Sequence, residues 1–169
     1  MNLLDTYGKN NHLHVIIETP SGNRNKFNYD KKTGLFKLKK LMPVGLIFPC
    51  DMGFIPGTLG EDGDPLDALV LMDDSAYPGC LIECRLVGVL KALQKEKGKK
   101  RFRNDRFLLV PANIKHYSHI QKIKDLNPQT LDAIVNFFVS YNEYEKKQFE
   151  VVGFSNSKTA HRLIKNQKL

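Results

Sequence analysis

Three aspartates lie within the six residues 62–67 of the segment Glu-Asp-Gly-Asp-Pro-Leu-Asp, which spans residues 61–67. Carboxylates this close repel one another unless a positive charge lies among them, and the segment contains no lysine or arginine. Carboxylate oxygens are the ligands that hard cations such as Mg²⁺ and Mn²⁺ prefer. The segment therefore predicts a divalent-cation site built from Asp62, Asp64 and Asp67.

The backbone chemistry of the segment fits a loop that runs into a strand. Gly63 permits a tight turn, and the proline that follows Asp64 fixes the direction of the chain into the apolar run 66–72. Asp62 and Asp64 would then lie on a loop, and Asp67 at the start of a rigid strand. An ordinary acidic surface turn remains an alternative, because Asp-Gly and Asp-Pro are common turn dipeptides. An EF-hand fits less well, because no helix precedes the segment.

The elements that must position these carboxylates are mostly strands. Apolar and alternating runs predict strands at residues 12–19, 26–30, 35–40, 66–72, 80–93, 107–111 and 149–152. Repeated proline and glycine in 42–58 predict a packed connection without a long regular element. Cap residues and helical spacing predict helices from Asn127 through Tyr144 and from Ser157 onward. Strands followed by helices indicate a single α+β domain over residues 1–169 with a barrel-like sheet.

The composition is that of a globular protein with a formal charge of +8 at pH 7, which favours anionic partners. Much of the positive charge falls in the segment 95–106. No apolar run is long enough to span a membrane, and residues 1–5 lack the basic-then-apolar pattern of a signal peptide. The three cysteines show no metal-type spacing. We therefore expect a cytoplasmic protein with reduced cysteines and no membrane association.

The motif Asp62-Gly63-Asp64-Pro65-Leu66-Asp67 resembles the signature of the soluble family I inorganic pyrophosphatases. Further similar stretches follow in the same order along most of the chain: 16–20, 26–27, 48–50, 53–55, 87–90 and 137–141. The resemblance implies a five-stranded OB-like β-barrel with flanking C-terminal helices. It also implies Mg²⁺-dependent hydrolysis of pyrophosphate to two phosphates by a metal-activated water. Bacterial members are usually homohexamers, so the resemblance implies a homo-oligomer as well.

The resemblance assigns roles to four carboxylates. Asp67 matches the residue that bridges two activating metals, and Asp62 matches a ligand of the first metal. Asp64 matches the residue that accepts the proton of the attacking water. Glu18 matches a carboxylate at the substrate-metal end of the site.

The same resemblance implies phosphate contacts and catalytic roles for basic and phenolic side chains. Lys26, Lys40 and Tyr141 match phosphate-binding positions, and Arg106 stands at a position where the family has a basic residue. Each side chain also has an ordinary interpretation. A strand lysine is commonly a solvated surface residue, and Tyr141 shares its helical stripe with core positions such as Phe138.

Several positions depart from the family pattern. Asn28, Met52, Gln94 and Asn142 replace Glu, Tyr, Asp and Lys, and Lys40 replaces Arg. In the family's Asp-x-Lys element the chain has Asn104-Asp105-Arg106. Either Asn104 weakens the metal site, or Asp105 becomes the ligand after a shift of one residue. Neutral amides in place of carboxylates predict weaker binding of additional Mg²⁺ ions, a higher Mg²⁺ demand and slower turnover.

Two other functions compete with pyrophosphate hydrolysis. A divergent protein of the same fold would act on another phosphoanhydride, or bind phosphate with little activity, and the substituted positions favour this alternative. A nucleic-acid-binding module would use the basic segment and the barrel surface. The acidic loop argues against the second alternative, because it would repel a phosphate backbone.

Overall fold

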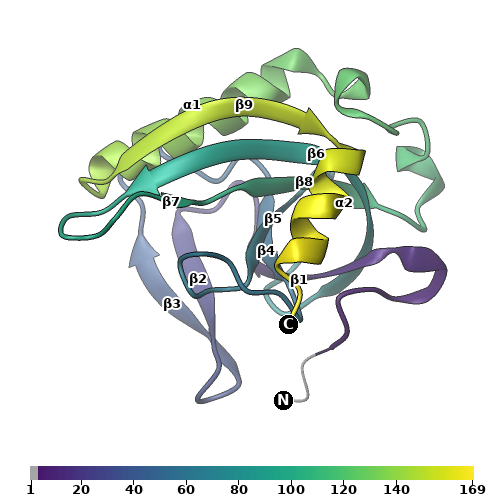
Figure 1. Cartoon of the computed structure of the whole chain (residues 1–169), viewed down its shortest axis with the longest axis horizontal. Coiled ribbons are helices and arrows are strands. Elements are labelled where there is room, and N and C mark those ends of the chain that lie inside the picture. The colour runs from purple at the N-terminus through teal and green to yellow at the C-terminus, as the bar shows by residue number, and fades with distance from the viewer. Residues whose placement is uncertain (1–3) are drawn as a thin grey trace.

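The computed structural model describes residues 4–169, and Figure 1 shows the whole chain. The prediction that residues 1–5 are not a signal peptide rests mostly on residues outside this range. The strands are β1 (Leu13–Thr19), β2 (Asn25–Asp30), β3 (Leu35–Leu41), β4 (Asp51–Ile55), β5 (Leu66–Val70), β6 (Leu81–Lys95), β7 (Phe102–Arg103), β8 (Arg106–Pro111) and β9 (Gln148–Asn156). The helices are α1 (Pro128–Tyr144) and α2 (Ser157–Asn166), with short 3-10 helices η1 (Lys9–Asn11), η2 (Lys115–Tyr117) and η3 (Ile123–Asp125).

Five strands pair in a closed cycle. β1 pairs with both β4 and β6, β4 pairs with β5, β5 pairs in parallel with β8, and β8 pairs with β6. β7 and β9 add to β6, while β2 and β3 form a separate hairpin. The helices follow the strands of the cycle in the chain, and Figure 1 shows them packed outside it. The arrangement confirms the predicted α+β class, with a five-stranded barrel and C-terminal helices.

Apolar side chains fill both faces of the cycle. Phe107 and Leu109 of β8 belong to the core cluster that includes α2 residues, whereas Leu108 and Val110 belong to the cluster that includes α1 residues. Successive side chains of a strand point to opposite faces, so a strand covered on both faces is apolar throughout. This explains why 107–110 is a continuous apolar run.

The structure corrects the prediction for residues 42–58, because the middle of this stretch is the strand β4. All five residues of β4 are buried between β1 and β5. A Cβ atom at Gly53 would lie 2.1 Å from the backbone oxygen of Ile16 on β1. Glycine therefore allows the two strands to approach one another here, and it does not mark a break in the strand.

Both helices begin where the sequence predicts, α1 at its predicted cap Asn127 and α2 at Ser157, with Asn156 as its cap. The Asn127 side chain accepts a hydrogen bond from the Gln129 N–H (2.9 Å), with Pro128 in the first turn. Asn156 accepts a hydrogen bond from the Thr159 N–H (3.0 Å) at the start of α2. Within residues 4–169, no helix is both long enough and apolar enough to cross a membrane.

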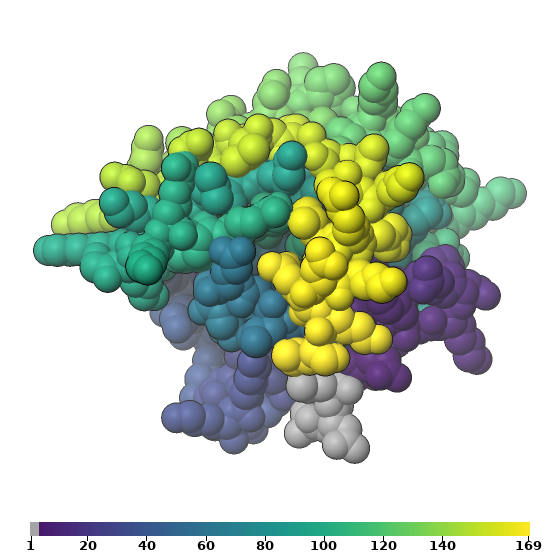
Figure 2. All heavy atoms as spheres, in the orientation of Figure 1, coloured from purple at the N-terminus to yellow at the C-terminus, as the bar shows by residue number. Residues whose placement is uncertain are grey.

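β6 continues past the cycle and forms a hairpin with β7. The turn of this hairpin projects from the body of the molecule, in teal at the left of Figures 1 and 2. The hairpin carries most of the basic segment 95–106, whose last residue, Arg106, begins β8. The topology therefore brings this segment beside the ends of the strands that carry the acidic loop.

Candidate active site

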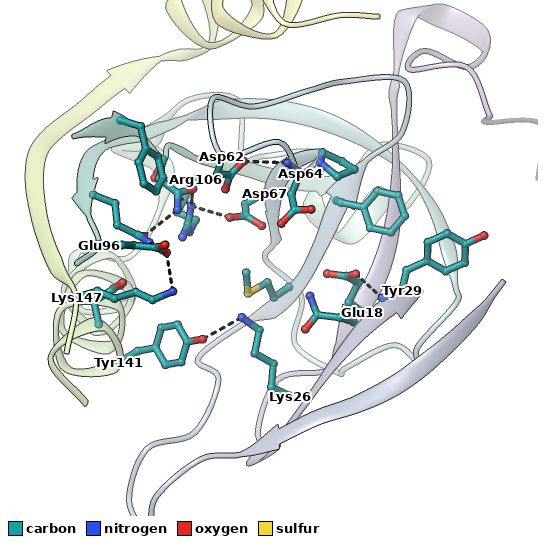
Figure 3. Close-up of a pocket in the computed structure, with 18 of the residues that line it drawn as sticks. Glu18, Lys26, Tyr29, Asp62, Asp64, Asp67, Glu96, Arg106, Tyr141 and Lys147 are labelled. Carbon is teal, nitrogen blue, oxygen red and sulfur yellow. Dashed lines mark hydrogen bonds and ion pairs between the residues drawn. The ribbon is translucent and has the colours of Figure 1, made fainter. Parts of the chain in front are cut away.

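One cavity of about 260 Å³ gathers most of the residues with predicted roles. These residues come from β1, β2, β5, β8, α1 and the loop before β5. They are Glu18, Lys26, Asp62, Asp64, Asp67, Arg106 and Tyr141. Figure 3 shows the labelled aspartates and Glu18 on one side of the cavity, with Lys26, Tyr141 and Lys147 on the opposite side.

The aspartate loop is a tight turn held by its own backbone. Gly63 has a φ of 88°, the Gly60 N–H donates to the Asp64 carbonyl (2.7 Å), and the Asp64 N–H donates to Asp62 Oδ1 (3.1 Å). Asp62 is exposed as a residue, yet partial desolvation of its carboxylate raises its pKa, and the charges of Asp67 and Asp64 add to this rise. The carboxylates thus repel one another, and a bound cation would relieve this repulsion.

Glu18, near the end of β1, lies on the same side of the cavity as the aspartates. The Tyr29 N–H donates to its Oε1 at 2.7 Å. Burial raises the pKa of Glu18 to about 7, and the charges of Asp67 and Asp64 act in the same direction, while the Tyr29 hydrogen bond and Lys26 oppose them. At neutral pH this carboxyl is therefore close to half protonated when no cation is bound.

The raised pKa of Glu18 predicts a pH-dependent stability of the metal-free protein. Because folding raises the pKa from 4.5 to about 7, the contribution of Glu18 is fully present below pH 4.5 and is lost as the pH rises through 7. In EDTA, the free energy of unfolding from urea denaturation should fall over this window by on the order of 2 kcal/mol more in the wild type than in Glu18→Gln. Glu143→Gln, at an exposed position of α1, is the control. Equal slopes in the wild type and Glu18→Gln would contradict the prediction.

Lys26 and Tyr141 form the centre of the opposite wall. The Lys26 Nζ donates to the Tyr141 hydroxyl at 3.1 Å and lies 5.0 Å from the centroid of its ring. The Tyr141 ring also stacks on Phe137, with centroids 6.0 Å apart and an interplanar angle of 2°. The two interpretations of Tyr141 are therefore compatible, because its ring belongs to the core and its hydroxyl group is bonded to a cavity lysine.

Lys40 lies behind this pair and is not among the residues that line the cavity. Its Nζ lies 5.6 Å from the centroid of the Tyr141 ring and makes an ion pair with Glu145. As placed here, Lys40 supports Tyr141 and does not face the cavity directly.

Arg106 connects the acidic wall to β8. Its Nη1 makes an ion pair with Asp67 Oδ2 at 2.7 Å and also donates to the Asn104 side chain. The guanidinium carbon lies 4.8 Å from the centroid of the Phe138 ring. The Arg106 side chain is only 5 % exposed, so this cation is fixed within the site.

The structure does not bring Asp105 into the cavity. Its Oδ1 accepts a hydrogen bond from the Ala92 N–H (3.1 Å), and its Oδ2 pairs with Arg103 (2.5 Å). Asn104 and Arg106 line the cavity, and the side chain of the residue between them points to the opposite side of the extended chain. Asp105 therefore has no part in the metal site proposed below.

The substituted positions also line the cavity, except for Lys40. The Asn104 Nδ2 donates to Gln94 Oε1 at 2.9 Å, so the two amides satisfy one another. Asn142 donates to the Phe138 carbonyl (2.8 Å), whereas the buried Asn28 Oδ1 has no hydrogen-bond partner within residues 4–169. Asn28 thus has an unused oxygen acceptor on a residue that lines the cavity.

Glu96 and Lys147 are among the charged residues of this cavity that sequence reasoning missed. The Lys147 Nζ makes an ion pair with Glu96 Oε1 at 2.8 Å. One residue follows β6 and the other follows α1, so no local spacing links them. The only available signal was that both segments border predicted strands that could meet.

The donor set of the acidic wall suits a hard divalent cation. Three aspartates and Glu18 present carboxylate oxygens to one cavity, and the unpartnered Asn28 Oδ1 adds a neutral oxygen. In the described part of the chain, however, no three His, Cys, Asp or Glu side chains already converge on one point. The Asp67 carboxylate pairs with the Arg106 guanidinium in this structure.

Comparisons with known proteins agree with this geometry. Residues 15–168 match the family model described as inorganic pyrophosphatase. An inorganic pyrophosphatase of Synechocystis sp. is 39% identical over 144 residues, covering 85% of this chain and 82% of the relative. One of Methanosarcina mazei is 37% identical over 154 residues, covering 91% and 88%.

Solved structures give the same result. An inorganic pyrophosphatase from Coxiella burnetii superposes with a TM-score of 0.88 at 32% identity, covering 97% of both chains. One from Thermus thermophilus gives a TM-score of 0.86 at 33% identity, covering 96% of this chain and 92% of that one. The fold, the family model and the relatives agree, and the chain belongs to the inorganic pyrophosphatase family.

Proposed function

We propose that this chain hydrolyses inorganic pyrophosphate to two phosphates in a reaction that depends on Mg²⁺, with Mn²⁺ as a substitute. One observation carries the proposal: a single cavity sets a wall of carboxylates against a wall of cationic and phenolic groups. Pyrophosphate is a compact polyanion, so its binding requires positive charge from the protein on one side and from metal ions on the other. Family membership supports the same activity.

The residues that would hold the metal are Asp62, Asp67 and Glu18, with Asn28 beside them. A bound divalent cation supplies charge neutralisation and a water molecule of lowered pKa. Asp64 lies on the same loop, and we assign to its carboxylate the proton of the attacking water.

The opposite wall would bind and orient the phosphoryl groups. Lys26 and the Tyr141 hydroxyl are already hydrogen-bonded to one another and can turn their remaining donors toward phosphate oxygens. Arg106 supplies a fixed positive charge near Asp67. Lys40 acts indirectly, through its contact with the Tyr141 ring.

Release of phosphate from pyrophosphate across a Mg²⁺ titration tests the function. We expect hydrolysis that requires about 1 mM Mg²⁺ or more for half-maximal rate, because Gln94 and Asn104 offer neutral amides where carboxylates would bind additional ions more tightly. Asn104→Asp should lower that concentration. Saturation of the wild type at micromolar Mg²⁺ would contradict the expected metal demand. No hydrolysis with either metal, together with activity on tripolyphosphate or a nucleoside triphosphate, would favour a different phosphoanhydride.

Three broader features belong to the same proposal. Residues 1–169 form one domain, supported by a family match that covers 15–168. The chain assembles into a homo-oligomer, a hexamer by resemblance to bacterial members. It acts in the cytoplasm, where biosynthetic reactions release pyrophosphate.

A further inference from the structure

The turn between α1 and β9 brings a lysine into the cavity. Lys146 adopts a φ of 56°, and the Lys147 N–H donates to the carbonyl of Asn142 at 2.9 Å. This turn directs the Lys147 side chain toward the space between Tyr141 and Glu96 (Figure 3). The Lys147 side chain is 32 % exposed, so a solute entering the cavity can reach its ammonium group.

Glu96 holds that ammonium group in place. Its Oε1 accepts from Lys147 (2.8 Å) and from the Gln94 amide (3.1 Å), and its Oε2 pairs with Lys99 (2.6 Å). Hydrogen bonds from Lys147 and Lys99 lower the pKa of Glu96 to about 2, so the carboxylate is charged throughout the neutral range. The Glu96 carboxylate is thus paired with two ammonium groups, those of Lys147 and Lys99, at the edge of the cavity.

The cluster of Glu96, Lys147 and Lys99 is joined to the acidic wall through side-chain hydrogen bonds. Arg106 donates to Asn104, Asn104 donates to Gln94 (2.9 Å), and Gln94 donates to Glu96 (3.1 Å). Each amide uses its oxygen toward the arginine side and its nitrogen toward the glutamate side. The orientation of Glu96 is therefore set by the same residues that contact Asp67.

We propose that Lys147 is a substrate-binding residue that contacts one phosphoryl group of pyrophosphate, and that Glu96 is a positioning residue that holds its ammonium group until the substrate displaces the carboxylate. The inference rests on the proposed pyrophosphatase function. In this inference Lys147, in the turn after α1, supplies a positive charge that Asn142, a neutral residue on α1, does not.

Charge and position support the replacement of the Glu96 carboxylate by a phosphoryl group at Lys147. Lys147 and Lys99 together carry two positive charges against the single negative charge of Glu96, so the cluster retains attraction for an anion of higher charge. Lys147 lies on the same wall of the cavity as Lys26 and Tyr141. A phosphoryl group bound by Lys26 and Tyr141 would therefore lie in the space that Lys147 also lines. A pyrophosphate oxygen can replace a Glu96 oxygen on Lys147 without loss of a charged hydrogen bond.

Steady-state hydrolysis of pyrophosphate at saturating Mg²⁺ tests the proposal. Lys147→Met should raise KM about tenfold or more and change kcat less, because it removes a charged contact made in the bound state. Lys147→Arg should restore most of the affinity. Glu96→Gln should lower KM by a few-fold, because pyrophosphate no longer competes with a carboxylate for the lysine. Lys97→Met, which removes one charge from an exposed position of the same hairpin, is the control.

The outcomes separate this inference from the proposed function. A wild type without pyrophosphatase activity would overturn the function itself. An active wild type whose KM is unchanged in Lys147→Met, or equally raised in Lys97→Met, would overturn the substrate contact. A KM that rises in Glu96→Gln as much as in Lys147→Met would show that Glu96 is part of the binding surface and does not compete with substrate. Thermal unfolding of each variant identifies any change in KM that comes from loss of structure.

Discussion

Asp67→Asn is expected to lower kcat/KM for pyrophosphate by about a thousandfold while the chain stays folded. Asp67 interacts electrostatically with three other charged groups of the site. It pairs with Arg106 at 2.7 Å, and its charge raises the pKa of both Glu18 and Asp62. Asparagine keeps the size of the side chain and one oxygen acceptor for Arg106, but it removes the negative charge that a divalent cation requires.

The comparison needs a carboxylate of the same type outside the cavity. Asp74, in the exposed segment after β5, provides one, and Asp74→Asn should keep the wild-type rate. Phosphate release at several Mg²⁺ concentrations, with circular dichroism of each variant, is the measurement. An Asp67→Asn protein that keeps more than about a tenth of the wild-type rate at saturating Mg²⁺ would remove Asp67 from the centre of the site.

Most of the fold could be predicted because its signals are local. The buried strand β8 is apolar from Phe107 onward, and α1 begins at its predicted asparagine cap. β4 could not be found this way, because Gly53 is a breaker in isolation. Its role depends on Ile16 of another strand, whose backbone oxygen lies where a side chain would begin. Contacts of this kind are not present in the sequence pattern.

The candidate site likewise contains residues that a local pattern predicts and residues that only the folded chain brings together. Asp62 and Asp64 occupy one turn and Asp67 lies at the start of the strand that follows, so their spacing alone predicts that their carboxylates face one region. Glu96 and Lys147 become neighbours only after β6, α1 and β9 have packed, and neither belongs to a motif. Asp105 shows a third limit, because a shift of one residue in an extended segment changes the side to which the carboxylate points.

Arg106→Met should be the most damaging change outside the carboxylates. The Arg106 side chain is 5 % exposed and the Asp67 side chain 22 %, so removal of the guanidinium leaves a largely buried carboxylate without its partner. We expect a loss of about 3 kcal/mol in the free energy of unfolding in EDTA, at the lower end for a broken buried pair because Asp67 keeps some contact with water. The rate of hydrolysis should fall about a hundredfold as a fixed positive charge is lost.

The same variant tests whether Arg106 and a divalent cation share Asp67. In the wild type a cation must bind a carboxylate that already pairs with a guanidinium, whereas in Arg106→Met that carboxylate is available. Saturating Mg²⁺ should therefore stabilise Arg106→Met more than the wild type, measured as the difference in urea midpoint with and without the metal. Arg106→Lys, which keeps the charge but cannot span Asp67 and Asn104 together, should lie between them. Equal stabilisation of all three proteins by Mg²⁺ would mean that the cation binds without Asp67, and the ligand set would then reduce to Asp62 and Glu18.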